Sequence, residues 1–184
     1  PGTRVKLKEY ITFLKKLERV KEKLESSGIT VKYVDVGGGI PDKLYLRVTD
    51  TKLEDYIYAI RDSIDAVLVL EPGRILVSDA MVLVTKVWYV KRSFGKRWVI
   101  CDAGVNVVPK ISFSTIEVEP VELRKAGGYA NVCGPLLFGN DILLKNWRGD
   151  VKEGNYLIIK NVGAYCYSLS WRLSYPIPKI KIIP

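Results

Sequence analysis

Three short segments carry residue types that could hold an anionic ligand. Gly37–Gly39 directly follows the apolar run Ile29–Val36, and the bare backbone N–H groups of glycines can approach a phosphate closely. Glu71–Arg74 follows the apolar run Ala66–Leu70 and offers an acid for a ring nitrogen and a guanidinium for a phosphate. Gly163–Tyr165 adds a phenol beside a tight backbone. Taken singly, each segment is equally compatible with a turn, an exposed salt bridge or a core tyrosine.

The composition excludes several kinds of chemistry. Among the 184 residues there is no histidine, so no catalytic triad or metal site of this chain can use one. Cys101, Cys133 and Cys166 are odd in number and lack Cys-X-X-Cys spacing, so we expect neither a disulfide framework nor a zinc site. The net charge of +9 attracts phosphates, nucleic acids or acidic proteins without selecting among them. The many lysines and the absence of glutamine are also typical of a heat-adapted protein.

The segments that must position these residues alternate between helix and strand in the first part of the chain. Apolar residues recur every three or four positions over residues 5–27, which predicts an amphipathic helix that Gly28 ends in a left-handed cap. The further predicted elements are a strand over 29–36, a helix over 51–64 opened by a capping box at Thr51–Glu54, and a strand over 66–70. Two such strand–helix units cannot close a barrel, so their open edge must be covered.

Beyond about residue 80 the pattern becomes that of an all-β domain. The predicted strands cover residues 82–91, 96–102, 111–119, 136–144 and 156–160, and Arg92–Gly95 predicts a hairpin between the first two. We therefore expect two domains, 1–80 and 81–184. The longest apolar runs are too short for a membrane span and no basic and apolar leader opens the chain, so the sequence favours a soluble cytoplasmic protein.

Five motifs become specific when their order is considered: Val34–Gly39, Glu71–Arg74, Asp102–Asn106, Cys133–Leu136 with Asp141, and Val162–Tyr165. From about Leu7 to Tyr175 the chain resembles the C-terminal half of the fold-type III pyridoxal-phosphate decarboxylases, which include the diaminopimelate, ornithine and carboxynorspermidine enzymes. The resemblance implies an α/β plus all-β chain: the last two βα units of a TIM-type (β/α)8 barrel, followed by a C-terminal β-barrel or sandwich domain. It also implies a dimer with sites shared across the interface.

The resemblance assigns binding roles around pyridoxal 5'-phosphate. The cofactor-binding residues would be Gly37, Gly38, Gly39, Glu71, Gly73, Arg74 and Tyr165. The glycines would wrap the phosphate through backbone amides, with charge-assisted bonds from Arg74 and a hydroxyl donor from Tyr165. Glu71 would face the pyridine nitrogen and keep it protonated, so that the ring withdraws electrons when the substrate loses CO2.

Catalysis concerns two further residues and two departures from the family. The resemblance places Asp102 and Asp141 at the substrate pocket as candidate catalytic residues. Family members carry a cysteine two residues after the Gly-Pro pair, where this chain has Leu137, and Cys133 is predicted to be a small buried residue. The family's Schiff-base lysine lies on an early barrel strand, upstream of the glycine motif and outside this chain. We therefore expect a partner, an N-terminal barrel half that is a separate chain or a missing segment, in a homodimer or hetero-oligomer.

The resulting interpretation is the C-terminal part or subunit of a pyridoxal-phosphate-dependent amino-acid decarboxylase. Such a carbon–carbon lyase of lysine or polyamine biosynthesis would act only when complemented by its N-terminal half. One alternative is a non-catalytic relative that binds and regulates a true decarboxylase, which the loss of the cysteine favours. Another is a basic β-barrel that binds nucleic acid through Trp88, Tyr89 and Trp98, and salt-sensitive binding to single-stranded oligonucleotides would identify it.

Overall fold

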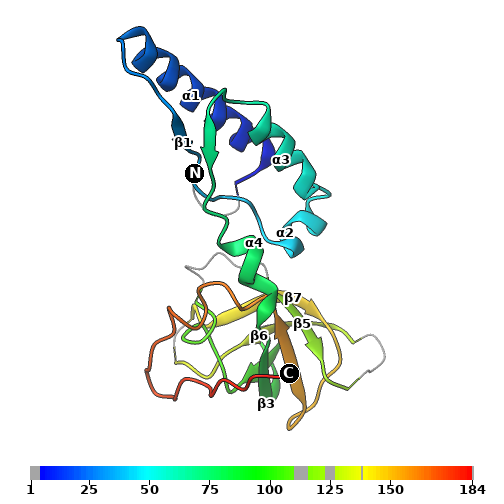
Figure 1. Cartoon of the computed structure of the whole chain (residues 1–184). Coiled ribbons are helices and arrows are strands. Elements are labelled where there is room, and N and C mark those ends of the chain that lie inside the picture. The colour runs from blue at the N-terminus through cyan, green and yellow to red at the C-terminus, as the bar shows by residue number, and fades with distance from the viewer. Residues whose placement is uncertain (1–4, 110–115, 123–126, 138, 184) are drawn as a thin grey trace. The chain divides into compact units, whose positions relative to one another are not determined.

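The computed structural model describes residues 5–109, 116–122, 127–137 and 139–183, and its elements are labelled in Figure 1. The chain divides into two compact units, Pro1–Val77 and Ser78–Pro184, so the first unit ends at residue 77 rather than at the predicted residue 80. Each unit has its own buried hydrophobic cluster and is described separately. Within these described ranges no helix is long and apolar enough to cross a membrane.

The first unit contains helices and a pair of parallel strands. In chain order these are α1 (Leu7–Ser26), β1 (Tyr33–Asp35), α2 (Lys43–Val48), α3 (Leu53–Arg61), β2 (Val67–Val69) and α4 (Arg74–Val77). β1 and β2 run parallel, with Val34 opposite Leu68. The predicted succession of helix, strand, helix and strand is confirmed, and Gly28 follows α1 with a φ of 83°, the left-handed conformation expected there.

One face of the β1–β2 pair is covered and the other is bare. The covered face packs against α1 and α3 in one buried cluster, which includes Tyr10, Leu14, Val34, Tyr56 and Ile60. On the opposite face Tyr33, Val67 and Val69 are 68%, 59% and 41% exposed, because successive side chains of a strand point to opposite faces. Parallel strands are normally buried on both faces. In the described part of the chain, this bare face (Tyr33, Val67 and Val69) lacks its usual cover.

The boundaries of several elements differ from the predicted ones. β1 and β2 are shorter than expected because only three residue pairs lie in register. α3 begins at Leu53, and Asp55 accepts a hydrogen bond from the backbone of the N-cap residue, Lys52, at 3.0 Å. The predicted capping box at Thr51–Glu54 is therefore wrong by one residue. α2 is additional to the predicted helices, and Asp42 caps its N-terminus.

The second unit is built around a six-stranded sheet. After a 3-10 turn (Ser78–Ala80) its strands are β3 (Leu83–Ser93), β4 (Lys96–Cys101), β5 (Glu117–Pro120), β6 (Tyr129–Cys133), β7 (Ile142–Arg148) and β8 (Tyr156–Lys160). Their order in the sheet is β5-β8-β3-β4-β6-β7. β3 and β4 form the predicted hairpin, and Phe94 and Gly95 turn the chain with φ values of 50° and 69°, the positive values that a two-residue turn needs.

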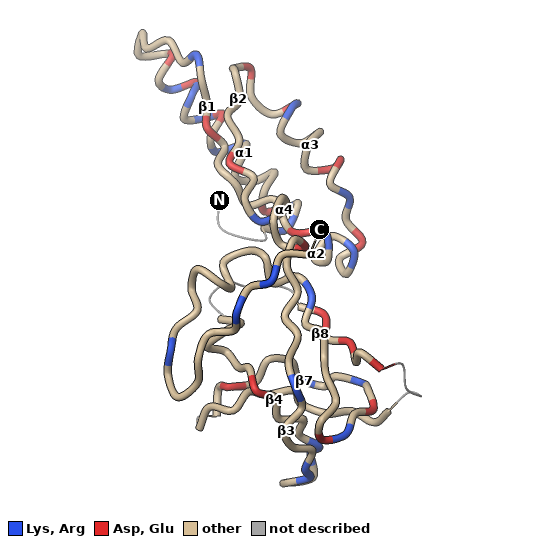
Figure 2. The backbone as a smooth tube through the Cα atoms, turned by 60° about the horizontal axis from the view of Figure 1, so that its bottom comes forward, with Lys and Arg blue, Asp and Glu red and all other residues tan. Residues whose placement is uncertain are grey.

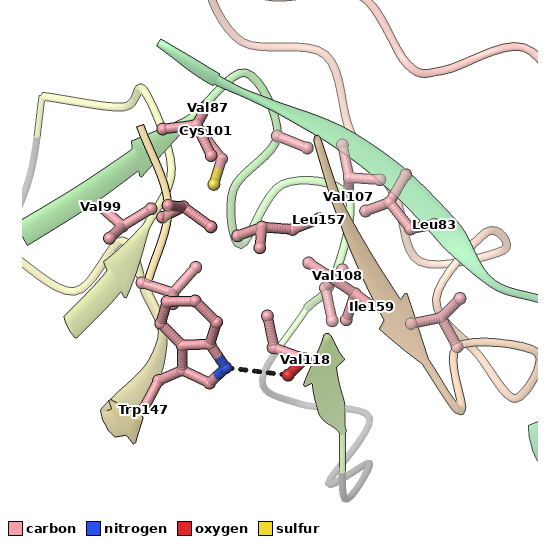
Figure 3. Close-up of a cluster of buried hydrophobic side chains, with 14 of the residues drawn as sticks. Leu83, Val87, Val99, Cys101, Val107, Val108, Val118, Trp147, Leu157 and Ile159 are labelled. Carbon is pink, nitrogen blue, oxygen red and sulfur yellow. Dashed lines mark hydrogen bonds between the residues drawn. The ribbon is translucent and has the colours of Figure 1, made fainter. Parts of the chain in front are cut away.

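The two edge strands of this sheet meet, so the sheet nearly closes on itself. The indole Nε1 of Trp147 on β7 donates a hydrogen bond to the carbonyl oxygen of Val118 on β5 at 2.8 Å (Figure 3). Val87, Val99 and Leu157 are fully buried in the interior that this contact helps to enclose (Figure 3). The second unit is therefore the barrel-like β-domain that the resemblance implied.

Some predicted strands of this unit need correction. The strand expected over 136–144 is wrong for most of its length, because residues 134–137 and 139–141 form a loop and β7 begins only at Ile142. The strand expected over 111–119 falls partly on residues 110–115, which lie outside the described residues, and its end belongs to β5. β6 is additional to the predicted strands.

Candidate anion-binding site

The glycine loop, Gly37–Gly39, has a backbone that only glycine fits. Gly37 and Gly39 have φ values of 67° and 89°, in the left-handed region that residues with a Cβ rarely adopt. A Cβ on Gly38 would lie 2.7 Å from the carbonyl oxygen of Glu71. The loop therefore passes directly against the segment that follows β2, and a side chain at any of its three positions would strain or displace it.

The carbonyl oxygens of the glycine loop all accept hydrogen bonds within the first unit. The bonds run from Glu71 N to Gly37 O (3.0 Å), from Tyr10 Oη to Gly38 O (3.2 Å) and from Val5 N to Gly39 O (3.3 Å). Gly37 N donates to a carboxylate oxygen of Asp35 at 2.7 Å. No described residue accepts a hydrogen bond from the N–H groups of Gly38, Gly39 or Ile40. The loop thus offers donors without an internal acceptor, as an anion cradle requires.

Glu71, Gly73 and Arg74 follow β2 at the same end of the strand pair. The bond between the backbones of Glu71 and Gly37 ties this segment to the glycine loop, and the Glu71 side chain is exposed. Arg74 begins α4 and is only 4% exposed. A planar guanidinium binds phosphate oxygens in pairs. The structure therefore brings the predicted loop and acid together, with the predicted arginine one turn further along the chain.

Tyr165 belongs to the second unit, in the turn that follows β8. Its φ of 66° is positive, and its side chain is 44% exposed. The carbonyl oxygen of Tyr165 accepts hydrogen bonds from Leu169 N at 2.9 Å and from Ser168 Oγ at 3.2 Å, so the turn is well defined. A non-glycine residue held in this backbone conformation is a frequent feature of ligand sites. That Tyr165 meets the glycine loop stays a prediction.

Asp102 connects β3 with the end of β4. Its Oδ1 accepts hydrogen bonds from Thr85 Oγ1 at 2.5 Å and from Lys86 N at 3.0 Å. Both bonds use the same oxygen, and no described residue donates to Oδ2. The carboxylate is therefore fixed in orientation and keeps one oxygen for a further donor.

Asp141 joins two loops of the second unit. It is 3% exposed, and its carboxylate oxygens accept hydrogen bonds from Val105 N at 2.8 Å and from Leu136 N at 2.7 Å. A Cβ on Gly104 or Gly134 would lie 2.3 Å or 2.5 Å from the same carboxylate, so both glycines are needed for the close approach. The geometry gives Asp141 an anchoring role: it holds the loop that presents Leu137, whose side chain is fully exposed.

The described cysteines are buried thiols. Burial raises the pKa of Cys133 to about 11 and that of Cys101 to about 12, so both thiols stay protonated near neutral pH. Cys133 Sγ lies 3.6 Å from the carbonyl oxygen of Val99. The prediction that Cys133 is a small buried residue is confirmed, and a protonated, buried thiol is a poor nucleophile.

The aromatic residues of the β3–β4 hairpin are engaged within their own unit. The ring of Trp88 meets that of Tyr175 edge to face at 5.4 Å, and the indole of Trp98 donates to Ser93 O at 3.2 Å. Lysines and arginines are interspersed with acids along the described chain (Figure 2). Tyr89 is more than half exposed, and the pairing of β3 with β4 shifts register between Val87 and Tyr89. These residues form no continuous stacking row on the described surface.

Residues behind the glycine loop escaped the sequence interpretation. Tyr10 was predicted only as part of the apolar stripe of the first helix, and Tyr56 lay within a helix to which no function was given. In the structure Tyr10 Oη bonds to the loop, and Tyr56 Oη donates to Val5 O at 2.8 Å. The one indication in the sequence is a tyrosine at a position where leucine or phenylalanine would fill the core, because a buried hydroxyl needs a partner.

The structure thus combines a pair of parallel strands that ends in a glycine loop with a barrel-like β-domain. The family model of the pyridoxal-dependent decarboxylases, C-terminal sheet domain, matches residues 44–163. The chain belongs to this family. The resemblance inferred from the ordered motifs is therefore confirmed.

Individual relatives agree with the family assignment. The chain is 32% identical over 170 residues to a diaminopimelate decarboxylase of Pseudomonas aeruginosa, covering 89% of this chain and 41% of the relative. It is 30% identical over 168 residues to a diaminopimelate decarboxylase of Aquifex aeolicus, covering 88% and 40%. The crystal structure of diaminopimelate decarboxylase from Helicobacter pylori complexed with L-lysine superposes with a TM-score of 0.70 at 27% identity, covering 92% of this chain and 44% of that one. The chain thus spans less than half the length of these relatives.

Proposed function

We propose that this chain is the C-terminal part of a pyridoxal-phosphate-dependent amino-acid decarboxylase of the diaminopimelate type. The observation that carries the proposal is the glycine loop: the N–H groups of Gly38 and Gly39 have no acceptor among the described residues, and the backbone of the loop tolerates no Cβ. The relatives that match are diaminopimelate decarboxylases, and their names supply the expected substrate class.

Different residues of the chain would bind different parts of a phosphate-bearing cofactor. The N–H groups of Gly38 and Gly39 would bind the phosphate, with Arg74 and Tyr165 as additional donors. Glu71 would accept a hydrogen bond from the protonated pyridine nitrogen. When bound, pyridoxal 5'-phosphate supplies an electron-withdrawing ring that stabilises the charge left by the departing CO2. The chain's own contribution is to bind and orient that ring and to hold the proton on its nitrogen.

The acidic residues of the second unit would serve the substrate side of the site. Asp102 keeps one carboxylate oxygen for a further donor, which suits an ammonium group of the substrate. Asp141, with a backbone N–H on each oxygen, would act by positioning the loop around Leu137 rather than by touching the substrate.

The bare face of β1–β2 supports the proposal that the rest of a barrel completes the first unit. Its exposed Tyr33, Val67 and Val69 lie on parallel strands, which require cover on both faces. We propose that an N-terminal barrel half carrying the Schiff-base lysine provides this cover, as a separate chain or as part of a longer protein. The complete (β/α)8 barrel would then work as a dimer with shared sites.

Complementation tests this function. The full chain is mixed with the N-terminal segment of the Aquifex aeolicus relative that precedes the matched region, and CO2 release from diaminopimelate is measured with added pyridoxal 5'-phosphate. The expected result is activity that requires both polypeptides and the cofactor. A matched mixture containing the Gly38→Ala variant serves as the negative control. A stable complex of both wild-type polypeptides that binds the cofactor but releases no CO2 would contradict catalysis.

A non-catalytic regulatory relative is the second candidate. Leu137 stands where the family carries a cysteine, and its side chain is fully exposed. An aliphatic side chain, unlike a thiol, can neither donate nor accept a proton. In the same experiment, this candidate predicts that adding the chain to a complete diaminopimelate decarboxylase changes the rate of that enzyme. The complementation experiment distinguishes the two, because only the catalytic candidate predicts CO2 release from the wild-type mixture.

A further inference from the structure

We propose that Tyr10 is a positioning residue for phosphate binding: its hydroxyl fixes the peptide between Gly38 and Gly39, so that the N–H of Gly39 points outward to the anion. The inference rests on the proposed function, because it assumes that the glycine loop binds a phosphate. The juxtaposition that carries it is the 3.2 Å bond from Tyr10 Oη on α1 to Gly38 O in the loop, across 28 residues of sequence.

Peptide geometry links the bonded carbonyls to the free N–H groups. A trans peptide is planar, and its C=O and N–H point in opposite directions. The carbonyls of Gly37, Gly38 and Gly39 share their peptides with the N–H groups of Gly38, Gly39 and Ile40. All three carbonyls accept a hydrogen bond, and none of the three N–H groups has a described acceptor. The donors that hold the carbonyls therefore orient the N–H groups.

Tyr10 is held rigidly enough to act in this way. Its side chain is fully buried, and its ring meets those of Tyr56 and Phe13 edge to face at 5.6 Å and 6.2 Å. Burial raises the pKa of the Tyr10 hydroxyl, so the group stays protonated and remains a donor. A glycine triplet has the most flexible backbone that a protein can use, so a fixed donor behind it removes freedom that would otherwise be lost on binding.

Tyr56 also holds the loop, through an indirect chain of hydrogen bonds. Its hydroxyl donates to Val5 O at 2.8 Å, and Val5 N donates to Gly39 O at 3.3 Å. Two buried tyrosines from neighbouring helices thus hold adjacent peptides of the loop, one directly and one through the chain segment before α1. Phenylalanine would fill either position equally well, so the hydroxyls contribute through their hydrogen bonds rather than through packing.

The test compares Tyr10→Phe with the wild type in the full chain. Binding of inorganic phosphate and of pyridoxal 5'-phosphate is followed by NMR through the amide signals of Gly38, Gly39 and Ile40. We expect Tyr10→Phe to bind both probes roughly 2- to 12-fold more weakly, the range for one neutral hydrogen bond. The Gly39 amide signal should broaden or split in the variant without ligand, because its peptide is no longer fixed.

Two controls separate positioning from general stability. Tyr58→Phe removes the same atom from an exposed tyrosine of α3, and Ile60→Val trims a buried residue of the same cluster without touching the loop. Both should bind phosphate as the wild type does. If Tyr10→Phe does not fold, Tyr56→Phe tests the indirect support of the loop through Val5. We expect this variant to bind phosphate more weakly and to have a perturbed Gly39 amide signal.

The outcomes distinguish this inference from the proposed function. If the amide signals of Gly38, Gly39 and Ile40 in the wild type do not change with either probe, the proposed function is wrong, and this inference is wrong with it. A wild type that responds, together with a Tyr10→Phe variant that binds equally well and keeps a sharp Gly39 signal, overturns the positioning role alone. Equal weakening in Ile60→Val and Tyr10→Phe also overturns it, because stability would then explain the effect.

Discussion

Gly38→Ala is the most informative single change, because it adds one methyl group at the point where the glycine loop passes β2. The new Cβ would lie 2.7 Å from the backbone oxygen of Glu71, and the two atoms must separate by about 0.7 Å to reach ordinary contact. Glu71 cannot simply move away, since its N–H bonds to Gly37 at 3.0 Å. We expect a loss of about 1–3 kcal/mol in the free energy of unfolding, the usual cost of overpacking.

The same displacement should weaken phosphate binding. Loss of one charge-assisted bond from the loop costs about 1.5–3 kcal/mol, which corresponds to roughly a 10- to 150-fold change in affinity. The measurements are urea unfolding and titration with pyridoxal 5'-phosphate. Gly128→Ala is the matched control, because a Cβ there meets nothing within 4 Å, and it should change the free energy of unfolding by less than about 0.5 kcal/mol. A Gly38→Ala variant with wild-type stability and affinity would show that the loop accommodates a Cβ and that its close approach to Glu71 does not matter for binding.

The isolated chain should release no CO2 from any amino acid, and borohydride reduction with pyridoxal 5'-phosphate should label no single lysine stoichiometrically; one labelled lysine with CO2 release would contradict this. Arg74→Ala should weaken cofactor binding by about 1.5–3 kcal/mol in the complemented complex, with partial recovery in Arg74→Lys, whereas unchanged affinity in both would remove Arg74 from the site. Asp141→Asn should lower the free energy of unfolding by about 1–3 kcal/mol in urea, because an amide N–H₂ then faces a backbone N–H, while the half-exposed Asp150→Asn should have little effect. Burial raises the pKa of Cys133 from 9.0 to about 11, so the unfolded chain loses this proton first and stability should fall between pH 9 and 11. Cys133→Ala should remove part of that slope in pH-dependent unfolding.

The glycine loop could be predicted from the sequence because its chemistry depends on the backbone alone. Three glycines after an apolar run specify both the bend and the bare amides, and the structure gives Gly37 and Gly39 the positive φ that such a loop needs. An open edge was likewise expected, because two strand–helix units cannot close a barrel, and the structure adds that one face of β1–β2 is bare as well. Both features follow from local residue types and from simple counting of elements.

Features that depend on distant partners could not be predicted. Residues 136–144 look like a strand because leucine and isoleucine are frequent there, yet the buried carboxylate of Asp141 holds much of the segment as a loop. Tyr10 fits an apolar helix stripe, and only its bond to Gly38 gives its hydroxyl a purpose. In each case the deciding contact joins residues whose neighbourhood the sequence does not reveal.

The most direct test of the central claim is the position of the cofactor phosphate in a crystal structure of the complemented complex with pyridoxal 5'-phosphate. We expect phosphate oxygens within hydrogen-bond distance of Gly38 N and Gly39 N, with the Arg74 guanidinium on the same phosphate. A cofactor whose phosphate is bound by other residues, with the glycine loop unliganded, would contradict it.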